Sequence, residues 1–190
     1  MLFFGHEGIT LGAATLVAGA LNRRGANGIV KRPWFAALTN YIDVRMLAVG
    51  ALLPDIIDKP LGIYILKIQN GRIYAHTLLF LLIIGGAGYY LYKSRKQAWL
   101  LTLAAGTLTH LVFDEMWQVP STLFWPLFGW GFPRYELGDY IMSLLKEIFT
   151  NRYFFTTELI GLIIVIWFIV WLLYRHKFGT FIMRGKISQS

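Results

Sequence analysis

The chain has no cysteine and few acidic residues, with ten aspartates and glutamates against eighteen lysines and arginines in 190 residues. Without cysteine it can form no disulfide, thiolate zinc site, iron–sulfur cluster or cysteine nucleophile. Charged residues make up only 15% of the sequence, whereas hydrophobic residues make up 56%, above the usual apolar share of a soluble domain. Chemistry is therefore left to histidine, carboxylate and hydroxyl groups in a largely apolar chain.

Several long stretches carry almost no charge, and one bilayer crossing needs about 20 apolar residues. We expect helices at about residues 3–21, 46–57, 73–92, 98–115 and 158–175. The second of these is short, and Pro54 disfavours a regular helix there, so it is expected to be a half-membrane or buried helix followed by a loop at 59–71. The prediction is an all-α, polytopic membrane bundle of four to five transmembrane or half-membrane helices in one domain, residues 1–190.

Segment 116–157 differs from the rest in composition, with three prolines and several tryptophans. Tryptophan favours the membrane–water interface because its ring is apolar with one polar edge. We therefore expect an irregular interfacial segment that includes an amphipathic helix at 137–149. Its stretch 117–133 has two interpretations, which are a lid over a nearby site and a membrane anchor with no part in chemistry.

The net charge of +8 is concentrated between the apolar stretches. Loops 22–45 and 93–97 and the tail after residue 175 hold most of the basic residues, and the positive-inside rule places them in the cytoplasm. A basic chain can also bind nucleic acid, but here the basic clusters alternate with membrane segments, so we expect no nucleic-acid partner. The N-terminus lacks the features of a cleaved secretory signal. The prediction is an integral protein of the cell membrane with a cytoplasmic C-terminus.

Histidines and aspartates stand at the ends of four of the expected helices. The topology, set from lysine and arginine alone, places these residues together at the outer face: His6, Asp55, Asp58, His76, His110 and Asp114. Each alone has an ordinary explanation, such as an interfacial hydrogen bond or a turn. Ionisable groups are costly in a membrane, however, and their common side favours one shared polar site. His176 lies in the basic tail on the other face and is expected to be solvated.

Imidazole nitrogens and carboxylate oxygens bind zinc, manganese or iron without thiolates. The three histidines and three aspartates can together hold one or two divalent metals, with zinc as the first expectation and manganese or iron as alternatives. Two such metals would clamp a phosphoryl group and activate water. Glu7, beside His6, is a candidate general base or ligand, and Arg72 has the planar fork that suits phosphate oxygens.

Five short blocks of the sequence also carry a resemblance to a known family. They are GHEG at 5–8, LPDIID at 53–58, RIYAHT at 72–77, GTLTHLVFD at 106–114 and WPL at 125–127. Together they resemble the membrane-bound metal-dependent hydrolase family typified by the bacterial YdjM protein, in a form typical of archaea. This family is distantly similar to zinc-dependent phospholipase C and P1-type nucleases, which are all-helical phosphoesterases.

The resemblance implies a metal site and a hydrolytic activity. Its implied ligands are His6, Asp55, His76, His110 and Asp114, with Asp58 as a sixth. Two positions depart from the family pattern, because Asp55 and Asp58 are separated by two residues instead of one, and Gly71 stands where a histidine is frequent. One ligand of the family is therefore missing or supplied by another residue.

The leading hypothesis is a metal-dependent hydrolase that cleaves phosphoester bonds of lipid or lipid-linked substrates at the outer membrane face. In it the metals polarise the phosphoryl oxygen, Asp55 or Glu7 accepts a proton, and Arg72 neutralises the developing charge. Two alternatives remain open, which are an ion or small-solute transporter that uses the same residues and a non-catalytic membrane scaffold. The partners expected are membrane lipids, and the sequence does not indicate an oligomeric state.

Overall fold

The computed structural model describes residues 3–25, 42–134, 146 and 149–185. Within these residues the chain is helical and has no strand, which confirms the predicted all-α class. The elements are α1 (Phe3–Gly25), α3 (Val44–Lys59), η1 (Pro60–Ile65), α4 (Leu78–Arg95), α5 (Trp99–Phe113), η2 (Met116–Gln118), α6 (Pro120–Leu123), α8 (Arg152–Tyr174) and α9 (Phe178–Arg184).

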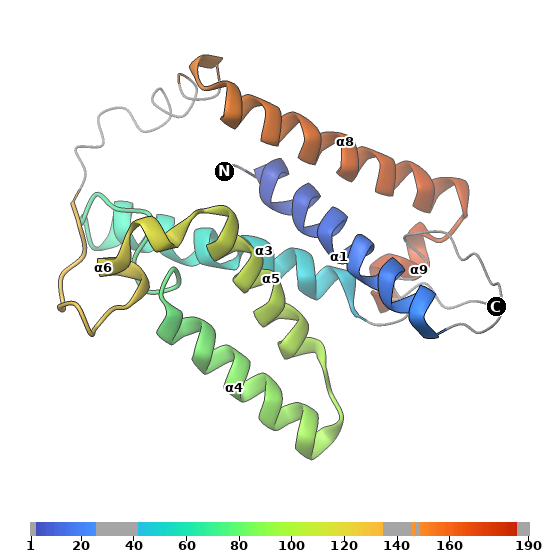
Figure 1. Ribbon diagram of the computed structural model, residues 1–190, viewed down its shortest axis with the longest axis horizontal. Coiled ribbons are helices and arrows are strands. Elements are labelled where there is room, and N and C mark those ends of the chain that lie inside the picture. The colour runs from blue at the N-terminus through green and yellow to red at the C-terminus, as the bar shows by residue number, and fades with distance from the viewer. Residues whose placement is uncertain (1–2, 26–41, 135–145, 147–148, 186–190) are drawn as a thin grey trace.

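Helices α1 and α8 run side by side, and α3 lies between this pair and α5 (Figure 1). A small apolar core forms where α1, α3 and α8 meet. It consists of Leu11, Ala18, Val44, Phe168 and Leu172. Helix α4 packs on α5 at the edge of the bundle, and large apolar side chains such as Leu82 on α4 and Ile163 on α8 are exposed. Such apolar outer surfaces suit a lipid environment.

Glycines set the closest helix contacts in this arrangement. A Cβ atom on Gly161 of α8 would lie 2.0 Å from the carbonyl oxygen of Phe4 in α1. A Cβ atom on Gly50 of α3 would lie 2.1 Å from the carbonyl oxygen of Leu103 in α5. Small residues let membrane helices approach this closely, and here the contact at Gly50 brings together α3 and α5, which both carry candidate site residues.

Among the described helices, α8 is long and apolar enough to cross a bilayer by length and composition, whereas α5 is apolar but has 15 residues. Helix α8 begins at Arg152, before the predicted 158, because the side chain of Asn151 caps its first turn. The polytopic arrangement of the remaining helices stays a prediction.

Helix α3 includes Pro54, as the predicted range 46–57 does, although proline disfavours a regular helix, and it is followed directly by the π-helical turn η1. Proline has no N–H, so the carbonyl four residues earlier, that of Gly50, loses its helical partner. The hydroxyl of Thr107 in α5 lies 3.2 Å from this carbonyl oxygen and 3.2 Å from that of Leu103 in its own helix, so it shares one hydrogen between the two acceptors. Side-chain hydroxyls compensate prolines in membrane helices in this way. The predicted loop at 59–71 is correspondingly shorter and begins after η1.

The expected helix 73–92 begins only at Leu78, so the prediction is wrong for residues 73–77. Asp58 of α3 accepts hydrogen bonds from the backbone amides of Ile73, Ala75 and His76. These amides are therefore held outside a helix, and the side chain of Thr77 caps α4 by accepting the N–H of Phe80 at 3.0 Å.

Other boundaries differ at the ends of the chain. Helix α1 extends to Gly25, beyond the predicted 21, and part of the basic tail forms α9. The segment after α5 contains η2 and α6, whereas most of the amphipathic helix expected at 137–149 lies outside the described residues.

Helix α9 is fastened to the start of α3. Asp43 caps α3 by accepting the amide of Arg45 at 3.0 Å, and the Arg45 guanidinium pairs with Asp43 and donates to the carbonyl oxygen of Ile182 at 2.7 Å. Burial raises the pKa of Asp43, but the hydrogen bonds from Arg45 outweigh it and hold that pKa below its usual range.

Candidate metal centre

Five of the predicted ligands meet in one cluster at the ends of three helices and a loop. His6 comes from α1, Asp55 from α3, His76 from the loop before α4, and His110 and Asp114 from the end of α5. All three histidine side chains are completely buried. The structure thus brings together residues that are separated by more than one hundred positions in the sequence.

The hydrogen bonds of His76 and His110 define which ring nitrogens are free to bind a ligand. His110 Nδ1 lies 2.6 Å from the carbonyl oxygen of Ala51, which can only accept, so Nδ1 carries the proton. His76 Nδ1 lies 2.7 Å from Asp58 Oδ2 and is a donor for the same reason. Each Nε2 atom therefore presents a lone pair in the neutral ring.

These two Nε2 atoms face each other at 3.2 Å. Two lone pairs at this distance repel unless a proton or a metal cation lies between them. Burial disfavours a charged imidazolium, and a metal ion shared by the two nitrogens removes the repulsion. The pair is therefore arranged as metal-ligating histidines are, with the second nitrogen of each ring held by a carbonyl or a carboxylate.

Two carboxylate oxygens complete a four-atom donor set around this pair. Asp55 Oδ1 lies 3.7 Å from His76 Nε2 and 3.9 Å from His110 Nε2. Asp114 Oδ2 lies 3.8 Å from each of the same nitrogens. Tetrahedral zinc with bonds of about 2.0–2.1 Å has ligand atoms roughly 3.3–3.4 Å apart. The Nε2–Nε2 separation of 3.2 Å is close to this value and the nitrogen–oxygen separations of 3.7–3.9 Å are longer, so a small inward shift of the carboxylates would let these residues hold a divalent metal.

His6 adds a further donor on the other side of His110. Its ring stacks on the His110 ring, with centroids 4.0 Å apart and an interplanar angle of 18°. His6 Nε2 is 3.1 Å from Asp114 Oδ1, an ion-pair distance, and both His6 nitrogens are buried without a hydrogen-bond partner among the described residues. Donor atoms of His6, Asp55 and His110 lie within 4.8 Å of one another, which makes an alternative metal group that shares His110 with the first.

Asp58 does not share the position of the other carboxylates. Its two oxygens accept the amides of Ile73, Ala75 and His76 and the Nδ1–H of His76. The carboxylate therefore lies behind His76, on the side away from the Nε2 atom. In this position it orients the ring and fixes its tautomer.

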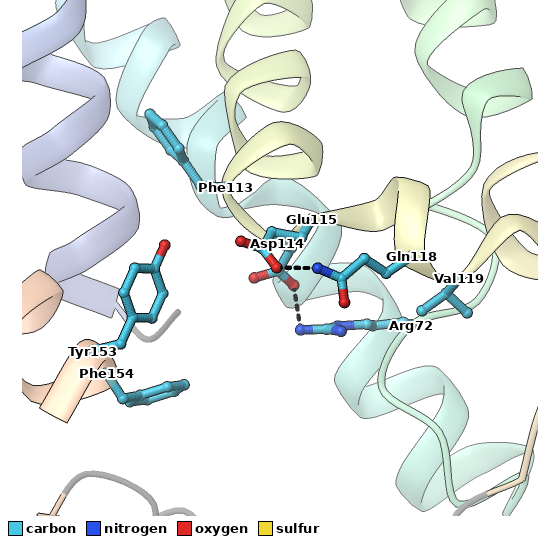
Figure 2. A pocket seen from close by; sticks show the side chains of 8 residues that line it. All are labelled: Arg72, Phe113, Asp114, Glu115, Gln118, Val119, Tyr153 and Phe154. Atoms are coloured by element: carbon cyan, nitrogen blue, oxygen red, sulfur yellow. Dashed lines mark hydrogen bonds and ion pairs between the residues drawn. The ribbon is translucent and has the colours of Figure 1, made fainter. Parts of the chain in front are cut away.

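Arg72 and Asp114 connect the cluster to an open pocket of about 210 Å³. Arg72 Nη2 lies 2.9 Å from Asp114 Oδ2, and the Arg72 side chain is 40% exposed. Figure 2 shows Arg72, Asp114, Glu115 and Gln118 on one side of the pocket and the α8 side chains of Tyr153 and Phe154 on the other. The pocket thus has a polar wall next to the cluster and an aromatic wall opposite.

Glu7 follows His6 on α1, and its Oε1 atom is buried without a hydrogen-bond partner among the described residues.

Three residues that support the site were not predicted from the sequence. Lys59 pairs with Asp55 Oδ2 at 2.6 Å, Glu158 accepts the amides of Phe4 and Gly5 at the start of α1, and Asn70 accepts the amide of Arg72. Only Lys59 had a visible signal, its i,i+4 spacing from Asp55.

A protein-family model described as the YdjM inner membrane protein matches residues 1–182. No curated protein and no solved structure matches the chain. The match covers nearly the whole sequence and so includes every residue of the cluster. It bears out the family and its membrane location, and it leaves hydrolysis, substrate and metal identity as predictions.

Proposed function

The chain belongs to the YdjM inner membrane protein family, and we propose that it is a divalent-metal-dependent hydrolase of phosphoester bonds in lipid or lipid-linked substrates at the outer membrane face. The observation that carries the proposal is the pair of buried Nε2 atoms, 3.2 Å apart, whose rings both donate through Nδ1. This arrangement suits a cation and leaves no role for either nitrogen in holding the fold.

His76, His110, Asp55 and Asp114 would hold the first metal, with zinc favoured by the nitrogen and oxygen donors. His6 would extend the centre toward a second ion through Asp114 Oδ1, which lies 3.1 Å from His6 Nε2. A bound divalent metal supplies Lewis-acid polarisation of a phosphoryl oxygen and a water of lowered pKa. Asp58 is a positioning residue for His76, and Lys59 holds the second oxygen of Asp55.

The pocket beside the cluster suits a phosphate attached to an apolar group. The Arg72 guanidinium has five N–H donors, and only its Nη2 pairs with Asp114, so other donors remain for phosphate oxygens. Phe113, Val119 and Phe154 line the same pocket. A lipid phosphate can therefore meet Arg72 while its apolar part lies against these side chains.

Glu7 is the better candidate for a proton acceptor than Asp55. Both oxygens of Asp55 are engaged, Oδ1 toward the histidines and Oδ2 with Lys59. Glu7 Oε1 is buried without a hydrogen-bond partner in the described part of the chain, so it has a free position for a proton. A Glu7→Gln variant should bind metal normally and lose hydrolysis.

The experiment measures phosphate or headgroup release from phospholipid vesicles by the purified full-length chain, with and without chelator and added zinc or manganese. We expect release that chelator abolishes and metal restores, and that Arg72→Ala reduces. His176→Ala is the matched control, because His176 is exposed at the end of α8, outside the cluster. Metal binding without hydrolysis of any phosphoester, with uptake of metal into the vesicles, would favour the transporter instead.

A further inference from the structure

A loop at residues 127–130 presents large apolar side chains that no other described residue covers. Leu127, Phe128 and Trp130 are 83%, 67% and 78% exposed, which ranks them among the most exposed large apolar side chains of the described residues. Gly129 between them has φ +120°, a conformation that glycine adopts without strain. The chain therefore turns sharply there and presents the three side chains outward.

The surrounding sequence is compatible with lipid and poorly suited to water. No aspartate, glutamate, lysine or arginine occurs from Met116 to Pro133. Trp117, earlier in the same stretch, is also exposed. Uncharged segments rich in tryptophan are typical of the bilayer interface, and contiguous exposed apolar patches mark interaction surfaces.

An aromatic cluster of Tyr74, Trp125 and Phe132 supports the loop. Trp125 stacks on Phe132 with centroids 5.7 Å apart, and Tyr74 contacts both rings edge-on at 5.3 and 4.9 Å. The Trp125 indole donates to the carbonyl oxygen of Trp130 at 3.1 Å. The outward side chains are therefore presented by a preformed support.

The same cluster joins the loop to the segment that carries the candidate site. Tyr74 lies between Arg72 and His76 in the sequence. The Asn70 side chain donates to the carbonyl oxygen of Pro133 at 2.8 Å and accepts the amide of Arg72 at 2.8 Å. A force on the loop is thus transmitted to the residues next to His76.

We propose that Leu127, Phe128 and Trp130 enter the bilayer on the site side of the membrane, and that the Trp125 cluster couples this lipid contact to the segment that carries Arg72 and His76. The partner is the lipid leaflet itself, since the protein belongs to a membrane family and the loop is free of charge. The lipid contact does not require a hydrolytic centre, because its grounds are the exposure, packing and lack of charge of the loop and the membrane family to which the chain belongs. The proposed role differs from both interpretations of stretch 117–133, because the stretch would be a membrane anchor that is coupled to the site.

The absence of cysteine allows a direct test. Single cysteines replace Leu127 or Phe128 in the full-length chain, carry a spin label, and are measured in vesicles of phosphatidylcholine and phosphatidylglycerol. Ile163→Cys on the exposed face of α8 is the lipid reference, and Gln97→Cys in the loop after α4 is the water reference. We expect the ratio of collisions with oxygen to collisions with a water-soluble nickel complex to be several-fold higher at 127 and 128 than at 97.

Two results would overturn the lipid contact. One is a collision ratio at 127 and 128 equal to that at 97. The other is dipolar broadening between labels on separate copies, because it would show that a second chain covers the loop.

The coupling has its own readout, which is hydrogen exchange of the amides of Ile73, Ala75 and His76. In Trp125→Ala we expect several-fold faster exchange at these amides and unchanged exchange in the middle of α8, which also shows that the variant is folded. Trp125→Phe keeps an aromatic ring and should stay near the parent rate. Unchanged exchange in folded Trp125→Ala would contradict the coupling.

Discussion

His76 and His110 face each other through their Nε2 atoms at 3.2 Å, while their Nδ1 atoms donate to Asp58 and to the carbonyl oxygen of Ala51. In each ring the hydrogen bond of Nδ1 fixes the orientation, and Nε2 presents a lone pair to the other ring. The arrangement is therefore determined by α3, which supplies both acceptors, and it connects helix packing to the proposed chemistry.

The first prediction concerns Asp58, which orients His76 without lying among the donor atoms. Asp58→Asn removes the charge that fixes the His76 tautomer, and losing such a support typically lowers metal affinity about 10–100-fold. Zinc titration of the purified protein with a competing chelator measures this change. Asp43→Asn, at the far end of α3, is the matched control and should bind zinc normally. Equal affinities for all three proteins would refute the positioning role.

The second prediction concerns the carbonyl that Pro54 leaves unpaired. Thr107→Val removes the hydroxyl that donates to Gly50 while keeping the side-chain shape, and we expect a loss of roughly 0.5–2 kcal/mol in the free energy of unfolding. Thr102→Val is the control, because that hydroxyl donates to Ala98 at the start of its own helix. Thermal unfolding in detergent compares the two, and similar midpoints for both variants would contradict the account of Pro54.

The third prediction tests the contact between α1 and α8. Gly161→Ala places a methyl group 2.0 Å from the Phe4 carbonyl oxygen, and overpacking of this kind typically costs about 1–3 kcal/mol. Gly19→Ala on α1 is the control, because a Cβ there has nothing within 4 Å. We expect Gly161→Ala to lower the unfolding temperature and Gly19→Ala to leave it unchanged or slightly raise it. An unchanged unfolding temperature for Gly161→Ala would mean that the helices are not packed so closely.

The fourth prediction concerns pH at the opposite end of the bundle. The pKa of Asp43 is lowered in the folded state, so its contribution to stability is fully present above the ordinary carboxyl pKa of about 3.9 and is lost as the pH falls through the folded value. Wild type should therefore be more stable than Asp43→Asn at pH 7, and the difference should shrink below about pH 4. Unfolding midpoints from pH 7 to pH 3 measure it, and a constant difference would exclude this pair as the cause.

The gathering of the site residues could be predicted from the sequence, because the topology expected from charge placement puts all these helix ends on one side. It predicts one face for His6, His76 and His110, and the three rings meet in the structure. Hydropathy predicts most of α1, α4, α5 and α8, because the length of an apolar stretch is a local property of the sequence.

The remaining features depend on contacts that no local pattern contains. The helix passes Pro54 because Thr107, on another helix, binds the carbonyl oxygen that the proline leaves free. Residues 73–77 are apolar enough for a helix, but Asp58 binds their amides instead. The same contacts separate the roles of Asp55 and Asp58, which sequence reasoning treated alike as ligands. Tertiary hydrogen bonds here outweigh the local preference.

The central claim is that the buried histidine–aspartate cluster holds a divalent metal, and metal content per chain tests it most directly. The full-length protein, purified without chelator and dialysed against trace zinc, should contain at least one equivalent by elemental analysis. The His76→Ala/His110→Ala double variant should contain none, and His176→Ala should match the parent. A metal-free parent protein that remains metal-free after zinc is added, or a double variant that retains the full equivalent, would contradict the account.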